Sequence, residues 1–380
     1  MSLTSFIEFP EVKEALQKSI PIIKTGLSSK DLKILPLSKD YGIVGTAFDY
    51  LLRFAIKKLK KRKCISDRWI AEKHSNILFL GSFLHKLADF SLLGKLYVRK
   101  LVQNIIKEEL PPLHQRLEKE IRGCISQAVK SGELSSSKFS RTHEDYIRDV
   151  ILTKLDQKLK DELNSKATGI FLFAKHYYDK FLEQDSFEVS DKLISAIVGL
   201  ANLDLFYRIG SFQFLRYNYN YAPAPVVKEL RMLYDVFLES PLWDKIAKAK
   251  CVVLNPSFKR SHLVGGADCD LVVDDTIFEI KVVKNYKKDT IFQLCGYFWL
   301  WKLGGFCKLS NDKKIKTPKI RKIGIYFARH GKMWEESIES LIPNPKLKKL
   351  LAYLTKVATS QKKLFSSNFF EKSSLIYTHD

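Results

Sequence analysis

The sequence predicts an α/β protein with a central mixed sheet flanked by helices, preceded by a large, mostly α-helical N-terminal region. Helical apolar periodicity dominates residues 1–220, whereas β-rich segments begin only after Pro223 and Pro225. From that point the order is one helix, three strands, a helix and a fourth strand (αβββαβ). The last strand–helix–strand unit should be a right-handed crossover between parallel strands.

The N-terminal region, residues 1–220, has the pattern of amphipathic helices joined by polar loops. Thr46 can cap an early helix that ends in the basic cluster Lys57–Lys63, which is either a solvated helix end or a nucleic-acid contact. The clearest loops are Pro111-Pro112 and Ser131–Ser140. Further helices are expected at Ser82–Glu109, Pro112–Lys130, Thr142–Leu163, Phe171–Leu182 and Ser190–Ile209.

The α/β core is expected over residues 221–335, and residues 336–380 are expected to form a basic helical extension packed on it. The extension should contain one or two amphipathic helices over Leu347–Phe365. The core elements, in order, are a helix at Val226–Leu238, strands at Cys251–Leu254, Val264–Val273 and Thr276–Val283, a helix from Asp289 to Leu303, and a strand at Lys322–Phe327.

The charge balance favours a polyanionic partner. Lys and Arg number 64 against 42 acidic residues in 380, which gives a formal net charge of +22. Such a field attracts nucleic acid, and a negatively charged membrane surface is the competing partner. The sequence shows no apolar stretch long enough to span a bilayer, no lipidation motif and no signal-peptide pattern. We therefore expect an intracellular, cytoplasmic protein that acts without a membrane.

Cysteine and histidine spacing argues against several metal classes. None of the six cysteines forms a C-x-x-C pair, so zinc ribbons and cysteine-clustered iron–sulfur sites have no support. The eight histidines are dispersed, without H-E-x-x-H spacing. The cysteines are expected to be reduced and mostly buried.

The stretch Gly265–Lys281 is typical of a β-hairpin with a two-residue loop, Asp274-Asp275. Side chains alternate along a strand, so residues opposite one another across the hairpin share a face. Four charged side chains would then project from one face: Asp268, Asp270, Glu279 and Lys281.

Three carboxylates on one face repel one another unless a cation neutralises them, and hard oxygen ligands select Mg²⁺, Mn²⁺ or Ca²⁺. Asp270, opposite Glu279, is the expected metal pair, with the main-chain carbonyl of Ile280 as a third ligand. Asp268, opposite Lys281, is either a further metal ligand or a salt-bridge partner of that lysine. Lys281 can orient or help deprotonate an attacking water and can stabilise charge on a reacting phosphate.

The pattern Gly-x-x-Asp followed by Glu-Ile-Lys, after a glutamate-bearing helix, resembles the PD-(D/E)xK nuclease superfamily. The segment Gln293-Leu-Cys-Gly-Tyr297 is similar to the Q-L-x-x-Y motif of its RecB-type and lambda-exonuclease-like branch. The resemblance covers residues 221–330 and implies a nuclease core with Mg²⁺ or Mn²⁺ as cofactor. The chain departs from the pattern because no proline precedes the aspartate, and the cysteine quartet of the iron–sulfur members is absent.

The resemblance also implies roles for single residues. Asp270 would be the motif aspartate, and Glu279 and Lys281 the E-x-K pair. Gln293 and Tyr297 would support the lysine or contact DNA. The simpler alternative is an exposed, charged hairpin face next to an ordinary helix surface.

Four further residues are weaker candidates. Glu229 would be the catalytic acid on the helix before the first strand, although glutamate is common in helices. Lys259, Arg260 and His262 precede the hairpin and are either phosphate contacts or solvated loop charges.

These observations predict a metal-dependent nuclease that hydrolyses phosphodiester bonds of nucleic acid, with DNA as the expected substrate, in repair, recombination or defence against foreign DNA. The helical N-terminal region would supply substrate grip, partner docking or regulation. One alternative is a non-catalytic nucleic-acid-binding or scaffold module on a nuclease fold, which typically lacks one member of the acid–lysine set. Another is a basic peripheral-membrane or structural protein whose acidic hairpin binds Ca²⁺.

Overall fold

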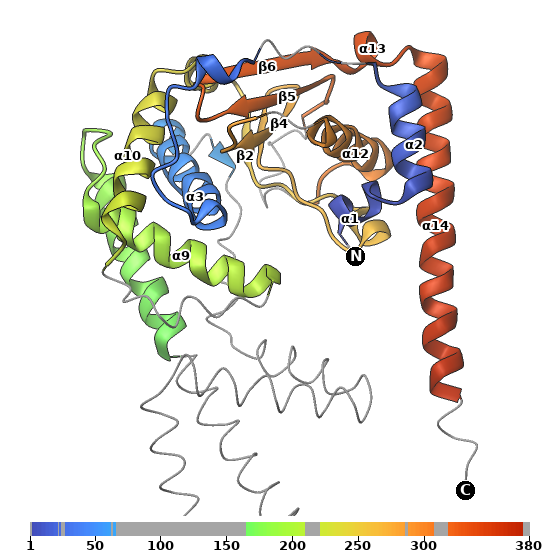
Figure 1. Ribbon diagram of the computed structural model, residues 1–380, viewed down its shortest axis with the longest axis horizontal. Helices are drawn as coiled ribbons and strands as arrows, with labels where there is room; N and C mark the ends of the chain where they lie inside the picture. The colour runs from blue at the N-terminus through green and yellow to red at the C-terminus, as the bar shows by residue number, and fades with distance from the viewer. Residues whose placement is uncertain are drawn as a thin grey trace, which may run out of the picture. The chain divides into compact units, whose positions relative to one another are not determined.

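The computed structural model (Figure 1) describes residues 2–21, 23, 27–61, 64–65, 165–209, 221–285, 288–307 and 318–374. The chain forms two compact units, one of Met1–Asp67 with Lys228–Asp380 and the other of Arg68–Val227. This division differs from the predicted boundary at residue 220, because the first 67 residues join the α/β unit. The predicted helices at Ser82–Glu109, Pro112–Lys130 and Thr142–Leu163, with the loops at Pro111-Pro112 and Ser131–Ser140, lie outside the described residues.

The first unit is built on a six-stranded mixed sheet in which the strands follow their order in the chain. β1 pairs with β2, and β4 with β5, in parallel, whereas the other neighbours are antiparallel. The predicted mixed sheet flanked by helices is therefore present. The strands are β1 Cys64–Ile65, β2 Val252–Leu254, β3 Leu271–Val273, β4 Thr276–Lys281, β5 Lys322–Phe327 and β6 Lys332–Ser337.

β3 and β4 form the predicted hairpin with its two-residue loop. Val273 pairs with Thr276 across Asp274-Asp275. Asp274 takes φ 52°, a left-handed conformation that Asp tolerates in tight turns. Its Oδ1 also accepts hydrogen bonds from two main-chain N–H groups just before β2, which ties the loop to the neighbouring strand.

The largest difference from the predicted strand boundaries is at the start of β3. β3 begins at Leu271 and not at Val264, because Gly265 and Gly266 have φ values of 74° and 120° and the chain there forms η4, Ser261–Val264. The two edge strands, β1 and β6, were not predicted from the sequence.

Helices cover both faces of the sheet (Figure 1). On one face α12, Asp289–Gly304, contacts β4 and β5, with α1, Leu3–Ile7, packed beside it. Behind them α2, Pro10–Ser19, lies against α14, Asn344–Ser374, which follows the short α13, Ile338–Leu341.

The opposite face is covered by α3, Tyr41–Lys60, α10, Ala224–Leu238, and α11, Pro241–Lys248. Phe237 of α10 meets Tyr326 of β5 with ring centroids 5.7 Å apart, and Phe48 of α3 with centroids 6.3 Å apart. α3 starts at Tyr41, so Thr46 lies within the helix and does not cap it.

The second unit contributes two described helices. One spans residues 165–183, and α9 spans Asp191–Ile209. These confirm the helices predicted at Phe171–Leu182 and Ser190–Ile209. No helix among the described residues is both long and apolar enough to cross a membrane.

Candidate active site

The acid–lysine set, Asp270, Glu279 and Lys281, lies at the end of the hairpin. Ile277, Glu279 and Lys281 are two residues apart along β4, so their side chains share one face of the sheet. Ile277 is fully buried on this face, which α12 covers, and the two charged side chains follow it at the end of the strand. The Lys281 Nζ donates to Glu279 Oε1 at 2.8 Å and to the Oε1 of Gln293, on α12, at 3.3 Å. The structure therefore brings the predicted E-x-K pair together with the predicted glutamine.

Tyr297 extends this chain of contacts on α12. Its hydroxyl accepts a hydrogen bond from Gln293 Nε2 at 2.7 Å, and its ring stacks on Phe258 with centroids 5.5 Å apart. Only 5% of Tyr297 is exposed, and burial raises the pKa of its hydroxyl. Of the two predicted roles, burial favours support of Gln293 and Lys281 over direct contact with nucleic acid.

Asp270 reaches β4 through its side chain. The β3–β4 ladder ends at the Leu271–Phe278 pair, and the next N–H of β4 on that side, from Ile280, donates to Asp270 Oδ2 at 2.7 Å. Burial raises the pKa of Asp270, and the charges of Glu279 and Asp49 raise it further. Continued by one residue beyond the ladder, the register places Asp270 opposite Glu279, as predicted.

The carbonyl of Ile280 faces the same side as the Asp270 carboxylate. Ala328 N–H donates to the carbonyl of Lys281 at 3.0 Å, so Lys281 directs its carbonyl toward β5. Successive carbonyls of a strand point in opposite directions, and the N–H and C=O of one residue share a side. The Ile280 carbonyl therefore points toward Asp270, as a third metal ligand requires.

Lys281 is held as a cation. Burial alone would lower the pKa of its ammonium, but the contact with Glu279 more than offsets this effect, and the pKa is raised. An ammonium that keeps its proton can orient a water or stabilise phosphate charge, whereas proton abstraction is disfavoured.

Asp49 is an acid of the site that the sequence analysis missed. It lies on α3, and its charge reaches Asp270. Asp49 Oδ2 accepts from Arg53 Nη2 at 2.6 Å, whereas Oδ1 is buried without a hydrogen-bond partner. The signal in the sequence was an acid within the apolar run from Ala47 to Leu52, almost all of which is buried.

The donor atoms at the site fit a hard divalent cation. Glu279 Oε2 is buried with no hydrogen-bond partner, as is Asp49 Oδ1, and such atoms are costly unless a cation or water satisfies them. In the described part of the chain, no group of three or more His, Cys, Asp or Glu residues is placed to hold a metal ion. Two carboxylates, Asp270 and Glu279, with the Ile280 carbonyl form a sparse oxygen set, and Mg²⁺ characteristically retains waters in its other positions.

Asp268 differs from the prediction. Its main chain forms a bridge with Ser257, next to β2, and its side chain is exposed. Among the ion pairs of the described residues, Lys281 pairs with Glu279 and not with Asp268. Asp268 therefore does not make the predicted ion pair with Lys281, although its charge, like those of Asp270 and Glu279, raises the pKa of Tyr297.

Lys259, Arg260 and His262 lie near the other end of α12. Lys259 N–H donates to the Gly305 carbonyl at 3.1 Å, and a Cβ on Gly304 would lie 3.0 Å from Arg260 Cγ. At 1.5 Å per residue this end of α12 is about 16 Å along the axis from Gln293. The three side chains are exposed, His262 on η4, and the structure does not bring them to the acid–lysine set.

Glu229 has a structural role, which corrects its predicted catalytic one. It is fully buried on α10, where Oε1 accepts from Arg329 Nη2 at 2.5 Å. Its Oε2 accepts from the main-chain N–H groups of Leu37 and Ser38, at 2.7 and 2.8 Å. Both oxygens are thus used to join α10, the turn after β5 and the segment that leads into α3.

Comparisons with known proteins assign no role to these residues, so their roles are argued from their chemistry alone. A scan against protein-family models found no match, and searches of curated proteins and of solved structures found none either.

Proposed function

We propose that the protein is a metal-dependent nuclease that hydrolyses phosphodiester bonds of nucleic acid, with DNA as the expected substrate. The observation that carries the proposal is the half-buried Lys281 ammonium held between Glu279 and Gln293, next to a glutamate oxygen with no partner. The core order αβββαβ and the net charge of +22 also agree with this class of function.

Each residue has a defined task in this proposal. Asp270, Glu279 and the Ile280 carbonyl would hold Mg²⁺ or Mn²⁺, which when bound would acidify an attacking water and neutralise phosphate charge. Lys281 orients that water and stabilises the developing negative charge. Gln293 fixes the lysine, and the buried Tyr297 fixes Gln293.

The second candidate is a non-catalytic nucleic-acid-binding module on a nuclease-like fold. It is favoured by the lack, within the described residues, of a cluster of three or more metal-ligating side chains. Retention of the whole acid–lysine set argues for the catalytic alternative.

A cleavage assay distinguishes the two candidates. Linear and circular DNA, single- and double-stranded, are incubated with the full chain in Mg²⁺, in Mn²⁺ or in EDTA. We expect cleavage that requires metal and that Lys281→Ala lowers by two to three orders of magnitude, about the effect of removing one preorganised charge-stabilising group. DNA binding should persist in the variant.

Lys284→Ala is the matched control, because Lys284 is an exposed lysine just beyond the end of β4. It should cleave at nearly the wild-type rate. Equal activity of Lys281→Ala and wild type would overturn the active-site assignment, and metal-independent binding without cleavage of any substrate would favour the non-catalytic module.

A further inference from the structure

The exposed face of α14 is a continuous basic surface. Between Asn344 and Phe370 the sequence contains six lysines and no acidic residue. At about 100° per residue, five exposed or partly exposed side chains fall within an arc of about 80° along the helix. They are Lys346, Lys349, Tyr353, Lys356 and Ser360.

Within the part of the chain that the structure describes, these lysines have no acidic partners. Lys346, Lys349 and Lys356 form no ion pair among the described residues, whereas lysines elsewhere in the same unit do. Lys13 pairs with Glu8, and Lys332 pairs with Asp31. The positive charge of α14 is therefore available to an external anion.

The opposite face of α14 is already used for packing. Leu347, Leu350, Leu354 and Ala358 are buried in the core, where α14 lies against α2. A helix that binds a membrane surface inserts its own apolar face between the lipids, and over residues 344–361, where the side chains of α14 are described, that face is buried against the core. Tyr353, 37% exposed, is the one large apolar side chain that the exposed stripe offers. This arrangement favours the phosphates of nucleic acid over a lipid surface.

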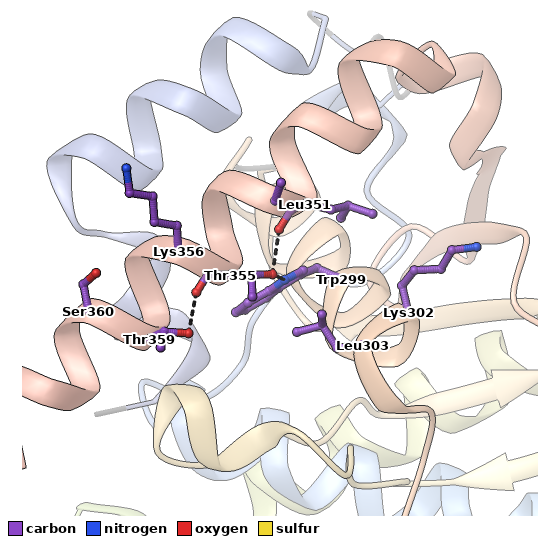
Figure 2. A pocket seen from close by; sticks show the side chains of 9 residues that line it. Trp299, Lys302, Leu303, Leu351, Thr355, Lys356, Thr359 and Ser360 are labelled. Atoms are coloured by element: carbon purple, nitrogen blue, oxygen red, sulfur yellow. Dashed lines mark hydrogen bonds between the residues drawn. The ribbon is translucent and has the colours of Figure 1, made fainter.

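A groove of about 610 Å³ runs between α12 and α14 beside the stripe (Figure 2). Trp299 of α12 donates its indole N–H to Thr355 Oγ1 at 3.0 Å, which fixes the two helices together. Lys302 and Lys356 are among the residues that line the groove, and none of the lining residues is acidic. The groove itself is mostly apolar, and these two lysines line it from different helices, Lys302 from α12 and Lys356 from α14.

This surface is separate from the candidate active site. Lys302 lies about 180° around α12 from Gln293 and about 14 Å further along its axis. The acid–lysine set and the basic stripe therefore lie on different sides of α12. A nucleic acid held on α14 would be anchored away from the reacting phosphate.

We infer that the exposed face of α14 is a nucleic-acid-binding surface that contacts the phosphate backbone through Lys346, Lys349 and Lys356. The inference takes its substrate class from the proposed function. Its test measures binding in EDTA, so it is independent of whether the protein cleaves.

The experiment measures the affinity of the full chain for single- and double-stranded DNA of one length across a salt series. In the triple variant Lys346→Gln, Lys349→Gln, Lys356→Gln, the slope of log affinity against log salt should become shallower by about three, and binding in 0.1 M salt should weaken by roughly two orders of magnitude. The matched control replaces the exposed Lys228, Lys248 and Lys250, on α10 and at the end of α11, with glutamine. This control should change the slope by less than about one.

An unchanged slope in the α14 triple variant would overturn the inference. Vesicles containing phosphatidylserine provide a second arm: loss of vesicle binding with normal DNA binding would assign the surface to membranes instead. The unfolding midpoint in urea verifies that the variant folds, and if it does not, Lys349→Gln and Lys356→Gln are tested singly, each with an expected slope change of about one. If wild type binds through α14 but never cleaves, the binding surface stands and the nuclease proposal fails.

Discussion

Two buried carboxylates of this protein, Glu229 and Glu279, contact cationic side chains but have opposite surroundings. Both oxygens of Glu229 accept hydrogen bonds, from Arg329 and from two main-chain N–H groups. Glu279 shares one oxygen with Lys281 and leaves the other buried without a partner. The first arrangement is complete by itself, whereas the second is complete only when a further ligand arrives. This difference distinguishes a carboxylate that stabilises the fold from one that still has an oxygen free to bind a ligand.

The largest expected effect is the loss of stability on removing the satisfied carboxylate. Glu229→Ala leaves the Arg329 charge buried and uncompensated and frees the N–H groups of Leu37 and Ser38. The cost should be about 3–5 kcal/mol of unfolding free energy, as for other broken buried ion pairs. Urea unfolding followed by circular dichroism measures it.

Glu229→Gln sharpens this result, because the amide oxygen can still accept from the main chain while the negative charge is lost. Its destabilisation should lie between those of wild type and Glu229→Ala. A loss of less than about 1 kcal/mol in Glu229→Ala would show that the pair is not a structural element of this kind.

The surroundings of Glu279 could be predicted from the sequence, whereas those of Glu229 could not. The hairpin, α12 and β5 are specified by local patterns: a two-aspartate turn, apolar alternation and helical periodicity. The contacts of Glu279, Lys281 and Gln293 follow from those patterns, because neighbouring elements place them together.

The surroundings of Glu229 and the position of Asp49 beside Asp270 depend on residues distant in the chain. Glu229 meets Leu37 across 192 residues of chain and Arg329 across 100. Asp49 reaches Asp270 from α3, within the N-terminal region that was predicted to be separate from the core. An acid before the first strand was a reasonable expectation, but only the packing of α3 shows that Asp49, and not Glu229, lies near the acid–lysine set.

β6 shows a different limit of sequence reasoning. Lys332–Ser337 is a partly exposed edge strand with charged side chains and without clear apolar alternation. Charges on an edge strand prevent pairing with other chains, and they also remove the signal by which a strand is recognised.

A smaller effect is expected when a divalent cation is added, and it tests whether Glu279 is the incomplete carboxylate. A ligand that binds only the folded state at ten times its Kd stabilises by about 1.4 kcal/mol. Mg²⁺ should therefore raise the unfolding free energy of wild type by about this amount, and Glu279→Gln should remove most of the increase.

Glu335→Gln is the matched control for the Mg²⁺ measurement, because Glu335 already has Lys245 and Lys322 as ion-pair partners. Mg²⁺ should stabilise this variant as it does wild type. An equal Mg²⁺ increment in Glu279→Gln would mean that the unpartnered oxygen takes no part in metal binding.

The smallest effect concerns His330, which follows Arg329 in the turn beside the satisfied carboxylate. Its Nδ1 is buried without a hydrogen-bond partner. Burial lowers the pKa of His330, as do the charges of Lys332 and Arg329, while Asp31 opposes them. A lowered pKa means that the unfolded chain takes up the proton first, so stability is full above about pH 6.5 and decreases as pH falls below it, by at most about 1.4 kcal/mol per pH unit. In His330→Asn this slope should be shallower than in wild type when unfolding is followed between pH 7 and 5. Identical slopes would show that protonation of His330 does not destabilise the folded state. The buried Nδ1 would then take up a proton at no cost in stability.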